Sequence, residues 1–128
     1  MVPQQYVTDI KAKLVASTAV ATITIVEERL LPDRGYFRAR LTLNNNDFLE
    51  VAEYFVAEAG RCVTRRYRYQ WMDAPQQVLR KRWDNVEHFP DLPNFPHHVH
   101  VSEESYVEPG RLLSVIELID VIEQELRA

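Results

Sequence analysis

The clearest evidence for the fold lies in the stretch YFRARLTLNNNDFLEVAEYFVAEAGRCVTRRYRYQWM, residues 36–72. It contains three runs rich in β-branched, aromatic and alternating apolar residues, which predict strands over 36–43, 48–58 and 61–72. The residues between the runs, NNND and AG, are typical of tight turns. Connections this short pair neighbouring strands antiparallel, so we expect a meander.

Further elements extend this core on both sides. Residues 18–31 predict a strand that turns through PDRG into 36–43, and residues 77–83 predict a fifth strand after DAPQ. A helix is expected over 3–16, where Pro3 suits the first turn and apolar residues follow at helical spacing. A last helix is expected after EPG, residues 108–110. Its apolar face would contain Leu112, Ile116, Ile119, Ile122 and Leu126.

These elements predict one α+β domain over residues 1–128: a five-stranded antiparallel sheet covered on one face by the N-terminal and C-terminal helices. Apolar residues make up 46% of the chain and charged residues 27%, as in folded soluble proteins. No apolar run approaches the roughly 20 residues of a membrane span, and the lone Cys62 suits a reducing compartment. We therefore expect a cytoplasmic protein that does not bind membranes.

The charge is unevenly distributed. The net charge is −4, yet residues 61–82 hold seven basic residues and one acid, Asp73, whereas residues 103–128 hold seven acids and two bases. A local basic surface can bind polyanions even on an acidic protein.

The basic strand predicts two faces by simple alternation. Arg66, Arg68 and Gln70 fall on one side. Tyr67 and Tyr69 fall on the other, together with Trp71, Arg61 and Arg65. Arginine beside aromatic rings suits phosphate contact and base stacking. The alternative is a solvated outer face with the rings packed at its edge.

All four histidines lie in RWDNVEHFPDLPNFPHHVHV, residues 82–101. Prolines at 90, 93 and 96 restrict the backbone, so this segment is expected to be a stiff connector. In an extended run His98 and His100 project to one side and His97 to the other.

Three roles compete for these imidazoles. The spacing does not match a standard structural zinc site, so we expect no metal and no cofactor. Acid/base cleavage of a phosphodiester would use two histidines near neutral pH, with arginine stabilising the phosphoryl charge. A structural role would cap turns or bond carboxylates such as Asp84, which could also orient a histidine.

The segments Tyr67-Arg68-Tyr69-Gln70, Arg82-Trp83-Asp84-Asn85 and His88 to His100 resemble the TumE family, the toxin component of a prokaryotic toxin–antitoxin system. The resemblance is strongest over residues 64–101 and centres on Phe95-Pro96-His97-His98-Val99-His100. Phe89 stands where the family usually has a second histidine, and Val86-Glu87 replaces a small residue and a proline.

The resemblance implies a growth-inhibiting toxin that a cognate antitoxin restrains, and it is consistent with RNA cleavage. On this hypothesis His98 and His100 share the acid and base roles, with His88 assisting. The expected RNA contacts are Arg66, Arg68, Arg82, Tyr67 and Tyr69, and the expected supporting residues are Asp84, Gln70 and His97. The alternative is a non-catalytic nucleic-acid or protein-binding module with structural histidines. The apolar alternation of residues 18–31 further predicts pairing across a two-fold axis in a homodimer.

Overall fold

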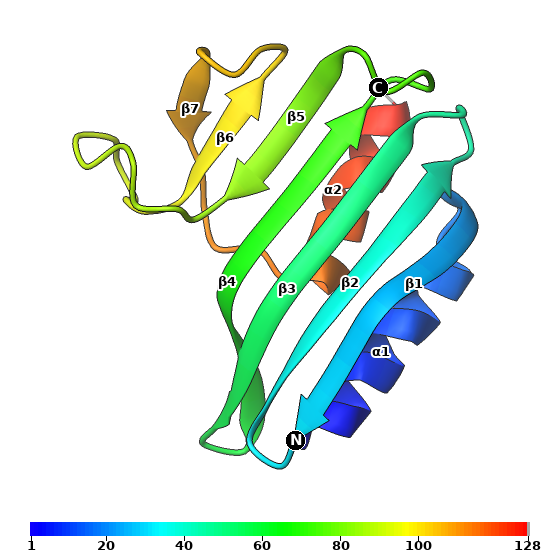
Figure 1. Ribbon diagram of the computed structural model, residues 1–128, viewed down its shortest axis with the longest axis vertical. Coiled ribbons are helices and arrows are strands. Elements are labelled where there is room, and N and C mark those ends of the chain that lie inside the picture. Colours follow the sequence, from blue (N-terminus) through cyan, green and yellow to red (C-terminus); the bar gives the residue numbers. More distant parts are fainter. Residues whose placement is uncertain (128) are drawn as a thin grey trace.

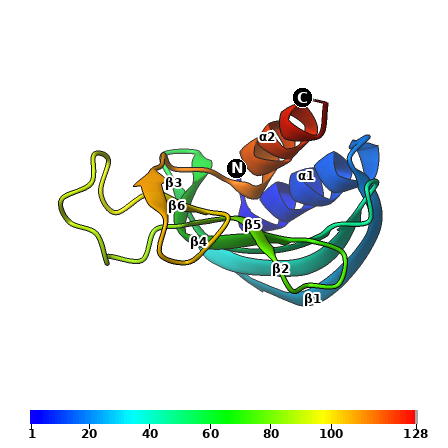
Figure 2. The ribbon, with the colours of Figure 1, turned by 90° about the horizontal axis from the view of Figure 1, so that it is seen from above.

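A seven-stranded antiparallel sheet carries two helices on one of its faces in the computed structural model, which describes residues 1–127 (Figures 1 and 2). Helix α1 spans Pro3–Ala16 and helix α2 spans Val115–Arg127. The strands lie across the sheet in chain order: β1 Val20–Leu31, β2 Arg34–Leu43, β3 Phe48–Glu58, β4 Arg61–Met72, β5 Leu79–Asp84, β6 His98–Val101 and β7 Val107–Pro109. The helix-covered side is called the inner face, and the other side the outer face.

The α+β class is confirmed, but the sheet has seven strands rather than five. The C-terminal end of the histidine segment is strand β6, not part of a connector, and it pairs antiparallel with β5. Strand β7 then pairs with β6. The prolines at 90, 93 and 96 all precede β6, so they remove no hydrogen-bond donor from its ladder.

Most of the expected elements lie where periodicity predicted them. Helix α1 and strands β3 and β4 have the expected bounds. Strand β2 starts earlier, at Arg34 inside the expected turn, and β5 starts at Leu79 and continues to Asp84. The last difference matters for function, because it places Asp84 in a strand.

Strand β4 contains a bulge that simple alternation does not reveal. Tyr54 pairs with Arg66 and Phe55 pairs with Thr64, so Arg65 is an extra residue in β4. One extra residue reverses the inward and outward order of the strand, and Thr64 consequently points inward.

The expected faces of β4 are therefore wrong at one end. Tyr67, Tyr69 and Trp71 are buried on the inner face and do not share an exposed face with Arg61 and Arg65. The side chain of Tyr69 is fully buried, and its hydroxyl donates to Leu113 O over 2.9 Å. These rings belong to the core rather than to a surface that could stack on bases.

The core fills the space between the inner face and the helices. Phe37, Ala39, Leu41 and Leu43 of β2 are buried in it, as the alternation predicted. Gly35 is required there because a Cβ atom would lie 2.7 Å from Phe55 Cζ. Helix α2 starts at Val115, later than expected, so Leu112 precedes the helix and is exposed.

Glu53 connects three elements inside this core. Its carboxylate accepts hydrogen bonds from Tyr6 Oη of α1 at 2.6 Å and from Thr64 Oγ1 of β4 at 2.7 Å. It also accepts one from Val115 N, at the start of α2, at 2.9 Å. Burial raises the pKa of the Glu53 carboxyl, because the charged form is disfavoured away from water.

Strand β1 lies at one edge of the sheet, and β7 lies at the other (Figure 1). The large apolar side chains of β1 are exposed at Ile25, Val26, Leu30 and Leu31. Within residues 1–127, neither helix has the length and apolar character needed to cross a membrane.

Candidate functional site

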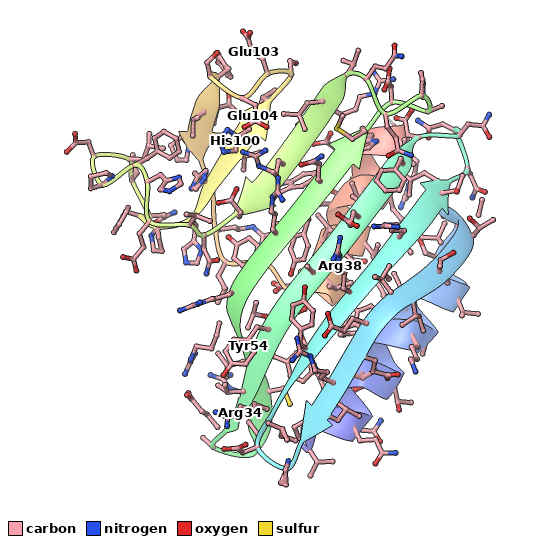
Figure 3. The ribbon with its side chains drawn as sticks, viewed as in Figure 1. Arg34, Arg38, Tyr54, His100, Glu103 and Glu104 are labelled. Atoms are coloured by element: carbon pink, nitrogen blue, oxygen red, sulfur yellow. The ribbon has the colours of Figure 1, made fainter. Side chains whose placement is uncertain are left out.

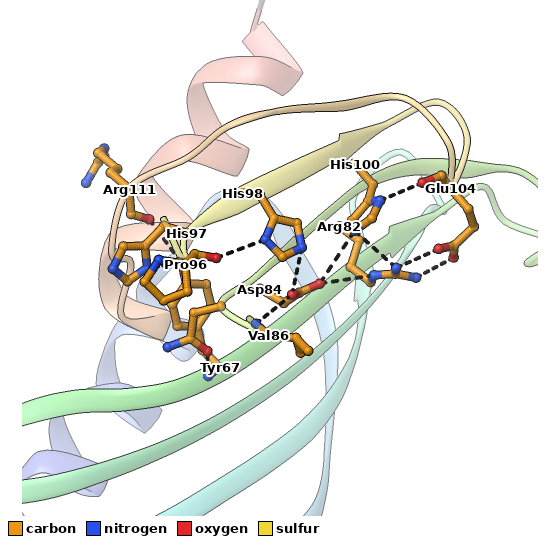
Figure 4. A network of polar contacts seen from close by, with 11 residues as sticks. Tyr67, Arg82, Asp84, Val86, Pro96, His97, His98, His100, Glu104 and Arg111 are labelled. Carbon is orange, nitrogen blue, oxygen red and sulfur yellow. Dashed lines mark hydrogen bonds and ion pairs between the residues drawn. The ribbon is translucent and has the colours of Figure 1, made fainter. Parts of the chain in front are cut away.

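A polar cluster on the outer face, where β5 pairs with β6, brings together the ionisable side chains of Asp84, His98 and His100 (Figure 4). The register places Asp84 opposite His98 and Arg82 opposite His100. Alternation along each strand directs all four side chains to the same face. The expectation that His98 and His100 share one side is confirmed.

Asp84 is the centre of the cluster and only 3% exposed. Its Oδ1 lies 2.9 Å from His98 Nε2 and accepts a hydrogen bond from Val86 N at 3.0 Å. Its Oδ2 accepts from Arg82 Nε at 3.3 Å and lies 3.8 Å from His100 Nε2.

Backbone carbonyls orient both imidazoles. His98 Nδ1 lies 2.9 Å from Pro96 O, and His100 Nδ1 lies 2.8 Å from Glu104 O. Because a carbonyl only accepts hydrogen bonds, each Nδ1 carries a proton. The Nε2 atoms of both rings are therefore the ones directed at Asp84, and Arg82 Nη2 donates to His100 Nε2 at 3.2 Å.

The two rings are almost fully shielded from water. His98 is 2% exposed and His100 is 4% exposed. The ring of Phe89 packs edge-on against both, with centroid distances of 4.9 Å and 5.9 Å. Phe89, which stands where the family pattern has a histidine, thus covers His98 and His100.

Arg82 is already engaged by protein groups. Both of its terminal nitrogens bond the Glu104 carboxylate, with Nη2 at 2.6 Å from Oε2. Burial opposes its charge, but the bonds to Glu104 and the proximity of Asp84 outweigh burial and raise the pKa of Arg82. Arg82 in turn lowers the pKa of the Glu104 carboxyl. The expectation that Arg82 holds phosphate therefore does not fit this geometry.

The other two histidines lie outside the cluster. His97 points to the opposite side, where its ring stacks on Tyr67 and its Nδ1 lies 2.9 Å from Tyr67 Oη. Burial lowers the pKa of His97. His88 is exposed beside Phe89, and its ring makes no hydrogen bond to the described residues.

A broad groove of about 1260 Å³ crosses the outer face beside the cluster. Strands β1, β2, β3 and β4 and the segment after β5 line it, and Figure 3 labels Arg34, Arg38 and Tyr54 among the lining residues. Arg68 pairs with Asp84 across β4 and β5, so the groove and the cluster adjoin.

The arginines of the groove differ in their partners. Arg38 pairs with Glu50 at 3.0 Å. Arg66 and Arg68 form no ion pair within residues 1–127, and Arg68 donates only to Gln70 Oε1 at 3.1 Å. Two arginine charges that form no ion pair with the described residues are thus available at the groove.

A model of the family described as Toxin TumE matches residues 10–128. This chain belongs to the TumE toxin family. Neither the curated proteins nor the solved structures gave a match. Membership of the family supports a toxin role.

Several residues of this TumE-family site were not predicted from the sequence. Arg34, Tyr36, Arg38 and Tyr54 line the groove from β2 and β3, although contacts were expected only from β4 and from Arg82 of β5. Their alternation with the apolar core residues of the same strands was a usable signal. Glu104 had no such signal, because the turn between β6 and β7 brings it to Arg82.

Proposed function

We propose that this TumE-family toxin binds single-stranded RNA along the outer-face groove and cleaves it beside the Asp84–His98–His100 cluster. The observation that carries the proposal is the adjacency of the two features. Arg66 and Arg68, which form no ion pair within residues 1–127, line the groove, and the buried cluster adjoins them.

The groove suits an extended polyanion. Its volume exceeds the roughly 300–1000 Å³ of a pocket for one small molecule. Arginine forks match phosphate oxygens bidentately. Tyr36 and Tyr54 line the same groove, and we assign to them the base stacking that the sequence predicted for the buried Tyr67 and Tyr69.

The chemistry is assigned to the cluster and to His88. Direct proton transfer needs a free ring nitrogen, and both nitrogens of His98 and His100 have protein partners. His88, exposed and without a hydrogen-bond partner among the described residues, is better placed to move a proton. His98 and His100 would act together with Asp84, as one unit.

RNA binding is tested by fluorescence anisotropy over a range of salt concentrations, with untagged protein. We expect the Arg66→Gln/Arg68→Gln variant to bind about 10-fold more weakly. Its salt slope should fall by about 0.7 for each phosphate that the variant no longer neutralises. The matched control is Arg61→Gln/Arg65→Gln, which removes the same charge from β4 outside the groove. Equally weakened binding in both variants would exclude the groove as the binding site.

Cleavage is tested with the same RNA on denaturing gels, with and without added divalent cations. We expect products from the wild type and from the Arg61→Gln/Arg65→Gln control, and none from His98→Ala. Binding without products under every condition would favour the second candidate, a non-catalytic binder. The burial of His98 and His100 is the observation that favours a non-catalytic binder.

Two partners belong to the proposal. A cognate antitoxin restrains the toxin, and co-expression of the protein encoded by the adjacent reading frame should restore growth. A homodimer through the exposed edge of β1 stays a prediction. Light scattering that gives a monomer mass at tens of micromolar would remove it.

A further inference from the structure

We propose that Asp84, His98 and His100 form a binding site for one divalent transition-metal ion, such as Zn²⁺ or Co²⁺. This inference goes beyond RNA binding and does not depend on it. It revises the expectation from histidine spacing, because the site combines two strands and uses only two of the four histidines.

The donor atoms converge closely enough for one ion. One ligand atom from each residue lies within 4.8 Å of the others, and all three residues are buried. Bonds of about 2.1 Å in a tetrahedral site separate neighbouring donors by roughly 3.4 Å. The distances from the Asp84 oxygens to His98 Nε2 and His100 Nε2 are 2.9 Å and 3.8 Å, on either side of that value.

The carbonyls behind the rings prepare them as ligands. Pro96 O and Glu104 O each hold a proton on Nδ1, which leaves Nε2 of each ring directed at the carboxylate. An outer hydrogen bond from the second ring nitrogen is the usual arrangement of metal-binding histidines. A lone pair on His98 Nε2 facing Asp84 Oδ1 at 2.9 Å is repulsive unless a cation or a proton lies between them.

The charge and ligand types also favour a divalent ion. With neutral imidazoles, Asp84 and Glu104 contribute two negative charges and Arg82 one positive charge. Two histidines and one carboxylate are a recurrent ligand set for first-row metals, and they leave coordination positions open for water or substrate. If the RNA proposal also holds, an ion here would sit beside bound phosphate and could polarise it.

Arg82 is the competing cation. Its guanidinium lies 3.2 Å from His100 Nε2 and 3.3 Å from Asp84 Oδ2. Both carboxylate oxygens of Glu104 accept hydrogen bonds from the same guanidinium. Glu104 can therefore keep Arg82 paired when His100 binds an ion. Removing the Arg82 charge should therefore strengthen metal binding, an effect that a purely structural histidine cluster would not produce.

The test uses the untagged chain of residues 1–128, stripped by chelator dialysis and titrated with Co²⁺ and then Zn²⁺ without RNA. We expect one Co²⁺ per chain, visible d–d absorption and its displacement by Zn²⁺. Asp84→Asn and His98→Gln should weaken binding by at least about 100-fold, since removing even an outer partner typically costs 10- to 100-fold. Arg82→Met should tighten it. His88→Ala, which removes an exposed imidazole outside the cluster, should leave it unchanged.

Two results would overturn the proposal: no binding by the wild type, or equal affinities in His88→Ala, Asp84→Asn and His98→Gln. If the cluster variants fail to fold, histidine ¹⁵N spectra of the wild type decide. Zn²⁺ must shift the Nε2 signals of two histidines that His88→Ala retains. If His98 Nε2 keeps its proton at one equivalent of Zn²⁺, the cluster is an ion pair between His98 and Asp84 and not a metal site, which would contradict the proposal. These metal-binding measurements contain no RNA, so their outcome does not depend on whether the groove variants bind RNA more weakly.

Discussion

Glu53 and Asp84 are both buried carboxylates on neighbouring parts of the same sheet, yet their surroundings are opposite in kind. Glu53 faces inward and accepts hydrogen bonds from two hydroxyls and a backbone amide. Asp84 faces outward toward two imidazoles and a guanidinium. Uncharged donors from three elements suit a structural connection, whereas ionisable partners from adjacent strands suit chemistry.

Among substitutions of the two carboxylates, Glu53→Ala should destabilise the fold most. The change leaves Tyr6 Oη, Thr64 Oγ1 and Val115 N without their acceptor in the core, and it leaves a cavity. We expect the free energy of unfolding to fall by about 3 kcal/mol. Urea denaturation followed by circular dichroism measures it, and a decrease below about 1 kcal/mol would contradict a structural role.

Glu53→Gln keeps the shape of the side chain and removes its ionisation, so it isolates the contribution of Glu53 to the pH dependence of stability. Burial raises the folded-state pKa of Glu53, so the folded state holds the proton more tightly than the unfolded state. Relative to Glu53→Gln, the wild type should lose stability as pH rises above about 4.5, by about 1.4 kcal/mol for each pKa unit between the two states. Parallel stability curves for the two proteins would refute the shifted pKa.

Phe89→Ala tests how the outer cluster is kept from water. Phe89 is only half-buried, so its removal should cost about 1.5 kcal/mol of stability, less than a core phenylalanine. We expect diethyl pyrocarbonate to modify His98 and His100 markedly faster once the ring is gone. Mass spectrometry of peptides locates the modified histidines, and His88 serves as the exposed internal reference.

The smallest effect on stability is expected for Asp84→Asn, at about 1 kcal/mol or less. Asparagine can still accept from Val86 N, and Arg82 keeps its pair with Glu104. Growth inhibition in cells should nevertheless disappear. A large change in stability, or full toxicity, would place Asp84 in the same structural class as Glu53.

Much of the fold could be predicted from the sequence because its signals are local. Helical spacing predicted α1, and β-branched runs between turn residues predicted β3 and β4 with their bounds. Strand β6 was missed because it is short, follows three prolines and is stabilised by pairing with β5. Stabilisation by a strand that is distant in the sequence cannot be recognised from the local residue pattern.

The site was predicted in part for the same reason. The projection of His98 and His100 to the same side follows from alternation, and Asp84 was identified as a partner for histidine. The burial of Tyr67 and Tyr69 was missed because one extra residue at Arg65 changes their side. The engagement of Arg82 by Glu104 was missed because a turn between strands brings the two together.

Because of the bulge at Arg65, the two ends of β4 should differ in how well they tolerate an inserted residue. Upstream of Arg65, the turn at Ala59-Gly60 and the bulge itself offer places where an inserted residue can be absorbed. Between Tyr67 and Trp71 there is no such place, and one added residue would drive arginine into the core and tyrosine into the groove. In a scan of single-residue insertions along β4, we therefore expect a change within a few positions from insertions that the fold tolerates to insertions that prevent folding.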